Sequence, residues 1–142
     1  MASTKRRSTK VRSKSSKVGA TNVAIIGAGR GGTALMEIFA NDPLVQIVGI
    51  AEVNTQAPGV ILAKQLQIPV TRDYRKLLAM ERVDLVIDVS GDAGVWQFLQ
   101  DFHRMGVTII GGASAKFMWE LIGARIRATA EIENTLNKYQ SL

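Results

Sequence analysis

The chain has 142 residues, of which 46% are hydrophobic and 6% aromatic, so its length and composition fit one domain with a hydrophobic core. It contains no cysteine, which excludes disulfides, thiol nucleophiles and thiolate metal sites and agrees with a reducing cytoplasm. No run of about 18 apolar residues is present that could span a membrane. The 18 basic residues outnumber the 12 acidic ones, but this excess arises at the N-terminus alone, which excludes a nucleic-acid footprint spread over the whole domain.

Residues 1–20 form a basic segment with no acidic residue and almost no apolar side chain to bury. Its bases are Lys5, Arg6, Arg7, Lys10, Arg12, Lys14 and Lys17. This composition predicts a disordered tail. The segment also lacks the apolar stretch of a secretory signal. The charge could dock the tail on an acidic protein, a nucleic acid or an anionic surface, or the tail could be only a solubilising leader.

Short apolar segments alternate with amphipathic ones over the rest of the chain. Strands are predicted at 23–26, 44–51, 69–71, 84–89 and 107–110. Helices are predicted at 31–40, at 58–67, after Asp73 and from Asp92 to about Met105. Strict alternation favours parallel strands joined by right-handed crossovers. We therefore expect an α/β fold with a doubly wound, five-stranded parallel sheet in the order 3-2-1-4-5.

The last segment predicts one long helix from Ser114 to Tyr139. Its apolar stripe consists of Ala115, Met118, Ile122, Thr129, Ile132, Leu136 and Tyr139, interrupted by Arg125. The first half should pack on the sheet, whereas the stripe of the second half is too narrow to be buried in so small a domain. That half is either a surface helix or a short coiled-coil seam in a homodimer. The predicted division is a tail (1–20), a domain (21–113) and a C-terminal helix (114–142).

The first predicted strand ends in a glycine-rich loop with the pattern G-x-G-x-x-G at Gly27, Gly29 and Gly32. Gly27 permits the turn out of the strand, Gly29 lets the backbone approach a pyrophosphate, and Gly32 lets the helix pack close to the strand. The free N–H groups at the helix start would hold the phosphates. Arg30 and Gly31 belong to the same loop, and Arg30 could reach a phosphate. The loop predicts a dinucleotide site, the alternative being a loop that only turns the chain.

Glu52 ends the second predicted strand, at the place where a carboxylate accepts hydrogen bonds from the adenosine ribose hydroxyls. It would also repel a 2′-phosphate, so NAD(H) is expected rather than NADP(H), although Arg30 could weaken this preference. Ser90 and Gly91 follow the fourth strand and should face the ligand across the point where the strand order reverses.

The sequence offers no constellation for catalysis or metal binding. His103 is the only histidine and is expected to be structural, and no acidic or histidine cluster has metal-ligand spacing. The glycine loop lacks the Gly-Lys-Ser/Thr ending of a P-loop. The small residues at 111–114 would either leave room for a nicotinamide ring or make a tight turn.

The stretch from Asn22 to about Ser114 resembles the N-terminal NAD-binding Rossmann domain of the glucose-fructose oxidoreductase-like dehydrogenases, and equally that of the dihydrodipicolinate reductase and aspartate dehydrogenase type. The shared phrases are VAIIGAGRGG, IVGIAEVN and DLVIDVSGDAGV. The chain resembles more closely a Rossmann module that precedes sensory or regulatory domains in bacterial signalling proteins. That resemblance rests on GAGRGGTAL, DPLVQIVGIAEVN, APG and GGASAKFMWEL.

The chain departs from the dehydrogenase pattern in two respects. Those families place Glu-Lys-Pro at the end of the fifth strand, where this sequence has Ile-Gly-Gly-Ala-Ser-Ala-Lys with Lys116 shifted. They also follow the domain with a substrate domain, which we expect to be absent here. Hydride transfer needs a positioned substrate and an acid or base.

Three functions follow as hypotheses. The first is a non-catalytic NAD(H)-binding sensor, regulatory or accessory subunit whose tail docks on an acidic partner. The second is the cofactor-binding half of an oxidoreductase that another chain completes. The third is a structural or assembly protein that uses the fold as a scaffold, with the tail binding nucleic acid or an acidic protein.

Overall fold

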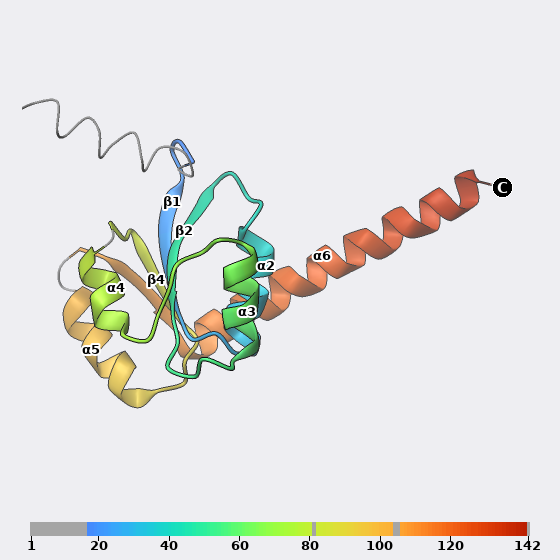
Figure 1. Ribbon diagram of the computed structural model, residues 1–142. Coiled ribbons are helices and arrows are strands. Elements are labelled where there is room, and N and C mark those ends of the chain that lie inside the picture. Colours follow the sequence, from blue (N-terminus) through green and yellow to red (C-terminus); the bar gives the residue numbers. More distant parts are fainter. Residues whose placement is uncertain (1–16, 81, 104–105, 142) are drawn as a thin grey trace, which may run out of the picture.

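The computed structural model describes residues 17–80, 82–103 and 106–141. Within these ranges five parallel strands form one sheet in the order β3-β2-β1-β4-β5 (Figure 1). The strands are β1 (Thr21–Ile26), β2 (Val45–Ala51), β3 (Val70–Thr71), β4 (Leu85–Asp88) and β5 (Thr108–Gly111). This order confirms the predicted doubly wound α/β fold.

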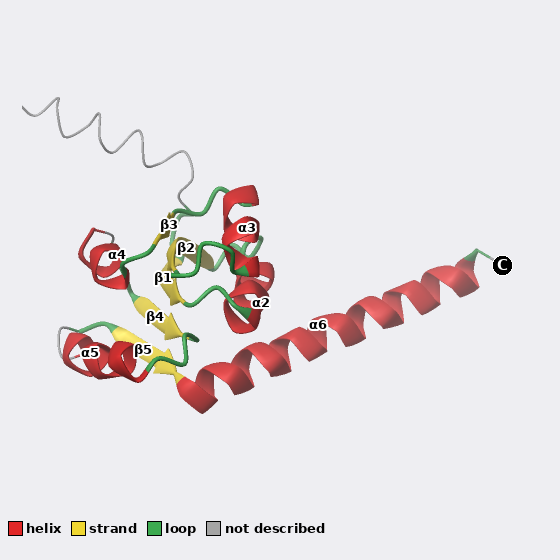
Figure 2. Cartoon of the chain, turned by 60° about the horizontal axis from the view of Figure 1, so that its bottom comes forward, coloured by secondary structure: helices red, strands yellow, loops and turns green. Residues whose placement is uncertain are grey.

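Helices cover both faces of the sheet (Figure 2). They are α2 (Arg30–Phe39), α3 (Pro58–Gln65), α4 (Tyr74–Met80), α5 (Ala93–His103) and α6 (Gly112–Gln140). α2, α3 and the start of α6 pack on one face, and α4 and α5 pack on the other. In the part of the chain that the structure describes, no helix is long and apolar enough to cross a bilayer.

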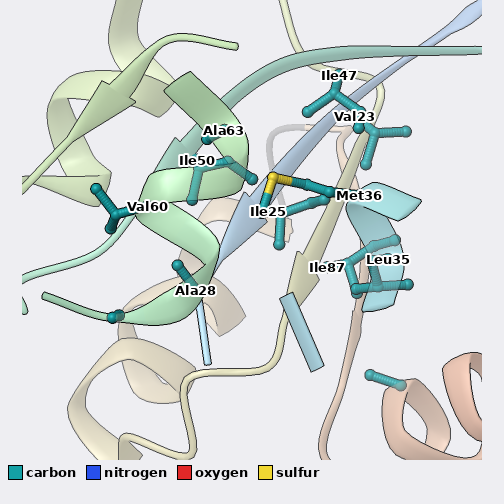
Figure 3. Packing of buried hydrophobic residues seen from close by; sticks show 12 residues of the cluster. Val23, Ile25, Ala28, Leu35, Met36, Ile47, Ile50, Val60, Ala63 and Ile87 are labelled. Carbon is teal, nitrogen blue, oxygen red and sulfur yellow. The ribbon is translucent and has the colours of Figure 1, made fainter. Parts of the chain in front are cut away.

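The central strand β1 supplies both halves of the core because its side chains alternate between the two faces. Val23 and Ile25 point into the cluster under α2 and α3, where Leu35 and Met36 meet them (Figure 3). Ala24 and Ile26 point into the cluster under α4 and α5. A strand buried on both faces needs an unbroken apolar run, which explains the sequence VAII.

Two helices begin directly after aspartates whose side chains cap them. Asp73 Oδ1 accepts the N–H of Arg75 at 3.0 Å, at the start of α4. Asp92 Oδ1 accepts the N–H groups of Gly94 at 2.7 Å and Val95 at 3.2 Å, at the start of α5. These bonds satisfy amides that the helices themselves leave without partners.

The structure describes residues 17–20, which belong to the predicted tail (1–20), and it places Lys17 against the domain. The ammonium group of Lys17 donates to the carbonyl oxygens of Ala40 at 3.1 Å and Asp42 at 2.8 Å, just after α2. Its backbone N–H donates to Gln46 Oε1 at 3.1 Å. A lysine side chain near the C-terminal end of a helix can donate hydrogen bonds to the last carbonyl groups. These bonds hold Lys17 on the domain, although its neighbours in sequence are typical of a tail. Residues 1–16, which hold the rest of the predicted tail, lie outside the described residues.

α6 begins at Gly112 and not at the predicted Ser114, because β5 leads into the helix without a loop. Gly111 provides the space for this passage: a Cβ at this position would lie 2.5 Å from the Trp96 ring. Trp96 therefore fills the space beside Gly111, one of the small residues at 111–114 that were expected either to leave room for a nicotinamide ring or to make a tight turn. Beyond its first turns α6 projects away from the domain, and its residues from Ala124 onward are exposed (Figures 1 and 2).

Candidate functional site

The glycine loop joins β1 to α2 at the carboxyl edge of the sheet. Gly27 has a φ of +108°, which lets it turn the chain out of β1. A Cβ at this position would lie 2.9 Å from the backbone nitrogen of Ser90, so glycine also lets the loop pass close to the segment after β4. A Cβ on Gly32 would overlap the carbonyl oxygen of Gly27. The two glycines thus place the first turn of α2 against the end of β1, as the motif predicts.

Gly29 differs from these two glycines because a Cβ there would meet no atom within 4 Å. The space above Gly29 is therefore open, and only glycine leaves it fully open to a ligand. No side chain among the described residues caps α2, whose first amides follow directly. Uncapped amides at a helix start favour an anion, and their partial positive charge is strongest there. Open space above uncapped amides fits a pyrophosphate.

Glu52 lies just after β2 and bridges to this loop. Its Oε1 accepts the N–H of Ala28 at 2.7 Å, and its Oε2 accepts the N–H of Asn54 at 2.9 Å. Each carboxylate oxygen can accept a second hydrogen bond. Glu52 is only partly buried, so its remaining lone pairs can receive hydroxyl donors. The Glu52 side chain is therefore held at the position where the sequence predicts an acceptor for the ribose hydroxyls.

The start of α3 supports the loop from behind. The N–H of Gly59 donates to the carbonyl oxygen of Ala28 at 2.7 Å. A Cβ on Gly59 would lie 2.5 Å from that same oxygen, so only glycine permits this approach. Both backbone groups of Ala28 are thus occupied, one by Glu52 and one by Gly59. Such a loop is fixed before any ligand binds, which lowers the entropic cost of binding.

The segment after β4 forms the opposite side of the site. Asp88 ends β4 and is 5% exposed, and its Oδ1 accepts both the backbone N–H and the hydroxyl of Ser90, at 3.0 and 2.6 Å. Gly91 follows with a φ of +71°. The carboxylate therefore fixes Ser90, and the glycine turns the chain toward α5. Ser90 and Gly91 lie beside the glycine loop, as the topology predicts.

A cavity of about 430 Å³ opens between these segments and α6. Its walls include Gly31, Asp88, Asp92, Trp96, Lys116 and Trp119. Gly31 and Gly91 belong to the predicted site, and Asp88 and Asp92 are carboxylates from the neighbouring strand end. The sequence does not predict the two tryptophans as site residues, because their contribution depends on how α5 and α6 pack around the strand ends.

Trp119 brings α6 against the glycine loop. A Cβ on Gly31 would lie 2.9 Å from Trp119 Nε1 and 3.1 Å from the Val89 side chain, so glycine at this position lets α6 pack close to the loop. The Arg30 guanidinium carbon lies 6.0 Å from the centre of the Trp119 ring, at the outer limit of a cation–π contact. In this conformation Arg30 is directed toward α6, a partner that the sequence does not predict.

The described residues contain no group of three or more His, Asp or Glu side chains that could hold a metal ion. The prediction that His103 is structural concerns a side chain outside the described part of the chain.

The element order, the glycine loop and the acid after β2 together define a nucleotide-binding Rossmann domain. Residues 21–110 match the model of the GFO_IDH_MocA family, described as an oxidoreductase family with an NAD-binding Rossmann fold. The chain belongs to this family. The match confirms the resemblance to the glucose-fructose oxidoreductase-like dehydrogenases and, at the level of the family, the expected cofactor NAD. The closer resemblance to bacterial signalling modules stays a prediction.

Two solved structures illustrate the likeness in fold. A myo-inositol dehydrogenase from Corynebacterium glutamicum has 18% identity and a TM-score of 0.57, over 65% of this chain and 27% of the dehydrogenase chain. GenD2 from gentamicin A biosynthesis, solved in complex with NAD, has 23% identity and a TM-score of 0.58, over 68% of this chain and 28% of its own. The chain thus spans little more than a quarter of either protein. No curated protein matches the sequence.

Proposed function

We propose that this chain binds NAD(H) without catalysing hydride transfer and acts as a sensor, regulatory or accessory subunit, with α6 as the element that responds to the ligand. The observation that carries the proposal is the shared cavity: Lys116 and Trp119 of α6 line it together with Gly31 of the glycine loop. A ligand that contacts the loop there also contacts α6. It can therefore shift any equilibrium between two positions of this helix for which its affinity differs.

The cofactor would be held by the predicted site residues. The amides of Gly29, Arg30, Gly31 and Gly32 would bind the pyrophosphate, and Glu52 would bind the adenosine ribose. Ser90 and Gly91 would flank the nicotinamide half. When bound, NAD(H) would supply hydride chemistry. Asp88 already accepts two hydrogen bonds from Ser90, so its carboxylate acts here to position Ser90. The carboxylate of Glu52 also supports a preference for NAD(H) over NADP(H).

Tryptophan fluorescence tests this proposal directly. The chain has only two tryptophans, and both line the cavity. NADH absorbs where tryptophan emits, so binding should quench the protein emission and sensitise that of NADH. The purified chain should show this saturable signal while the NADH absorbance stays constant for hours. Saturable quenching with steady consumption of NADH in the presence of a reducible small molecule as hydride acceptor would contradict the non-catalytic role. No quenching at all would contradict the placement of the ligand.

Replacing Gly29 by alanine should weaken NADH binding without destabilising the fold. The added methyl group would enter the open space above the loop, where the pyrophosphate is proposed to lie. We expect at least about a tenfold loss of affinity, equivalent to about 1.4 kcal/mol, measured by fluorescence titration. The thermal midpoint should stay close to that of the original chain. Gly123→Ala on α6 is the control, and an unchanged affinity in Gly29→Ala would argue against a pyrophosphate at this position.

The tail is proposed to dock on an acidic protein, a nucleic acid or an anionic surface. Lys17 holds the end of this segment beside the end of α2 and the start of β2, on the edge of the sheet opposite the glycine loop. Removing residues 2–16 should therefore change the NADH dissociation constant by less than about twofold. At about 0.1 M salt the charges of the tail are also screened beyond about 10 Å. A larger change in the titration would mean that the tail reaches the cofactor site.

A second candidate is the cofactor-binding half of an oxidoreductase that another chain or segment completes. The observation in its favour is that the cavity wall carries Asp88, Asp92 and Lys116, which are groups able to exchange protons or bind a polar substrate. This candidate predicts that a complex purified from the native cells oxidises NADH when a reducible small molecule is supplied as hydride acceptor, while the isolated chain does not. A cytoplasmic location and a homodimer through α6 also belong to the proposal, and cell fractionation tests the location.

A further inference from the structure

We infer that the cavity beside the glycine loop favours the oxidised form of the cofactor, because its walls suit the positively charged nicotinamide ring of NAD⁺ better than the neutral ring of NADH. The inference rests on the proposed function and adds the redox state to which the site responds. The two forms share their adenosine, pyrophosphate and ribose groups and differ only at this ring. Any difference in affinity therefore depends on the groups that line the cavity.

The topology directs the nicotinamide ring into this cavity. With the pyrophosphate at the start of α2 and the adenosine at Glu52 after β2, the other half of the cofactor must leave the loop toward β4, on the opposite side of β1. Gly31 of the loop and Gly91 after β4 both line the cavity of about 430 Å³. Small-molecule sites typically have about 300–1,000 Å³, so the cavity has room for the ring.

A buried carboxylate at the end of β4 lines the same cavity. Asp88 is 5% exposed, and its two hydrogen bonds, both from Ser90, end on Oδ1. Among the described residues no buried side-chain oxygen lacks a partner, so Oδ2, which receives no bond from them, keeps contact with solvent. Because Asp88 lines the cavity, this contact is made there. A charge buried in this way is screened much less than an exposed one, so Oδ2 would attract a cation in the cavity.

Two indole rings complete the walls, Trp96 from α5 and Trp119 from α6. Among aromatic side chains tryptophan attracts cations best, and the attraction is stronger where water is excluded. The Arg30 guanidinium already lies over the Trp119 ring at 6.0 Å, so a cation can reach this face. A bound pyrophosphate would offer Arg30 a stronger, charge-assisted partner and leave the ring to the nicotinamide cation.

Three positive groups oppose this preference, but their effect is weaker. The charges of Lys116 and Arg30 belong to exposed residues, so water and salt screen them. The start of α6 at Gly112 contributes only a partial charge of about one half. Asp92 on the cavity wall offsets Lys116. The buried carboxylate of Asp88 is thus the charge that the ring would feel most strongly.

Calorimetry of the full chain with NAD⁺, NADH and ADP-ribose, which lacks the nicotinamide ring, tests the inference. NAD⁺ should bind at least about tenfold more tightly than NADH, and NADH should bind within about threefold of ADP-ribose. If NAD⁺ and NADH bound equally, or NADH more tightly, the inference would be wrong while the proposed NAD(H) site would stand. If neither bound, the proposed function itself would fail.

Asp88→Asn tests the source of the preference. The amide keeps the shape of the side chain and an oxygen that can accept the bonds from Ser90, but it removes the charge. The affinity for NAD⁺ should fall by about tenfold, while those for NADH and ADP-ribose change by less than about twofold. Asp84→Asn is the matched control: it makes the same change just before β4, at the opposite edge of the sheet, where the carboxylate accepts the N–H of Asn22 at 2.9 Å.

The control should bind all three ligands as the original chain does, and circular dichroism checks that both variants are folded. An equal fall for NAD⁺ and NADH in Asp88→Asn would mean that the carboxylate only positions Ser90, which would overturn the inference. An unchanged affinity for NAD⁺ in this variant would overturn it as well.

Discussion

Gly32→Ala is expected to lower the free energy of unfolding by about 3 kcal/mol or more and to abolish NADH binding. The new methyl group would overlap the carbonyl oxygen of Gly27, which is backbone at the end of β1 and cannot rotate away as a side chain can. Relief requires the first turn of α2 to move off the sheet, and overpacking of this kind typically costs 1–3 kcal/mol or more. Chemical denaturation followed by circular dichroism measures the change.

Gly123→Ala is the matched control for this substitution. It makes the same chemical change in a helix, but the nearest atom to the new Cβ is the end of the flexible Arg127 side chain, at 3.3 Å. Alanine is the better helix former, so we expect the free energy of unfolding to stay level or to rise by up to about 1 kcal/mol. A Gly32→Ala variant as stable as this control would show that the loop has a different conformation in solution.

Glu52→Ala should weaken NADH binding by roughly ten- to a hundredfold and narrow the preference for NADH over NADPH. The substitution removes the acceptor of the Ala28 N–H bond and the proposed partner of the ribose hydroxyls. A hydrogen bond to a charged group is worth about 1.5–3 kcal/mol. It also removes the negative charge that would repel a 2′-phosphate. Titrations with both reduced cofactors measure the two effects.

Glu37→Ala is the control for charge, because Glu37 is an exposed carboxylate on α2 away from the loop. This variant should bind both cofactors as the original chain does. If Glu52→Ala lost affinity for NADH and NADPH equally, the carboxylate would act only by holding the glycine loop, and the choice of cofactor would lie elsewhere.

The fold was accessible from the sequence because its signals are local. A doubly buried strand reads as a short apolar run such as VAII, and the helix starts carry Asp73 and Asp92 where a cap is needed. Alternation of these elements leaves few topologies once crossovers are right-handed. The glycine loop was equally local, since Gly27 turns the chain with a φ of +108° and Gly32 is required by its contact with the carbonyl oxygen of Gly27.

The rest of the site depends on contacts between elements far apart in the sequence. Trp119 reaches Gly31 only because β5 runs directly into α6, and the space that Gly111 leaves is filled by Trp96. Nothing in the spacing of these residues indicates such pairs. Lys17 was missed for a similar reason: its neighbours are typical of a tail, while its partners lie after α2. Tertiary contacts decided these positions against the local pattern.

Isothermal titration calorimetry of the full chain with NAD⁺, NADH, NADPH, ATP and coenzyme A tests most directly whether the glycine loop binds a dinucleotide. We expect one site per chain for NAD⁺ or NADH in the micromolar range, weaker binding of NADPH, and a marked loss of heat for the Gly29→Ala variant. Heat for none of these ligands, or equal heat in Gly29→Ala and the original chain, would contradict it.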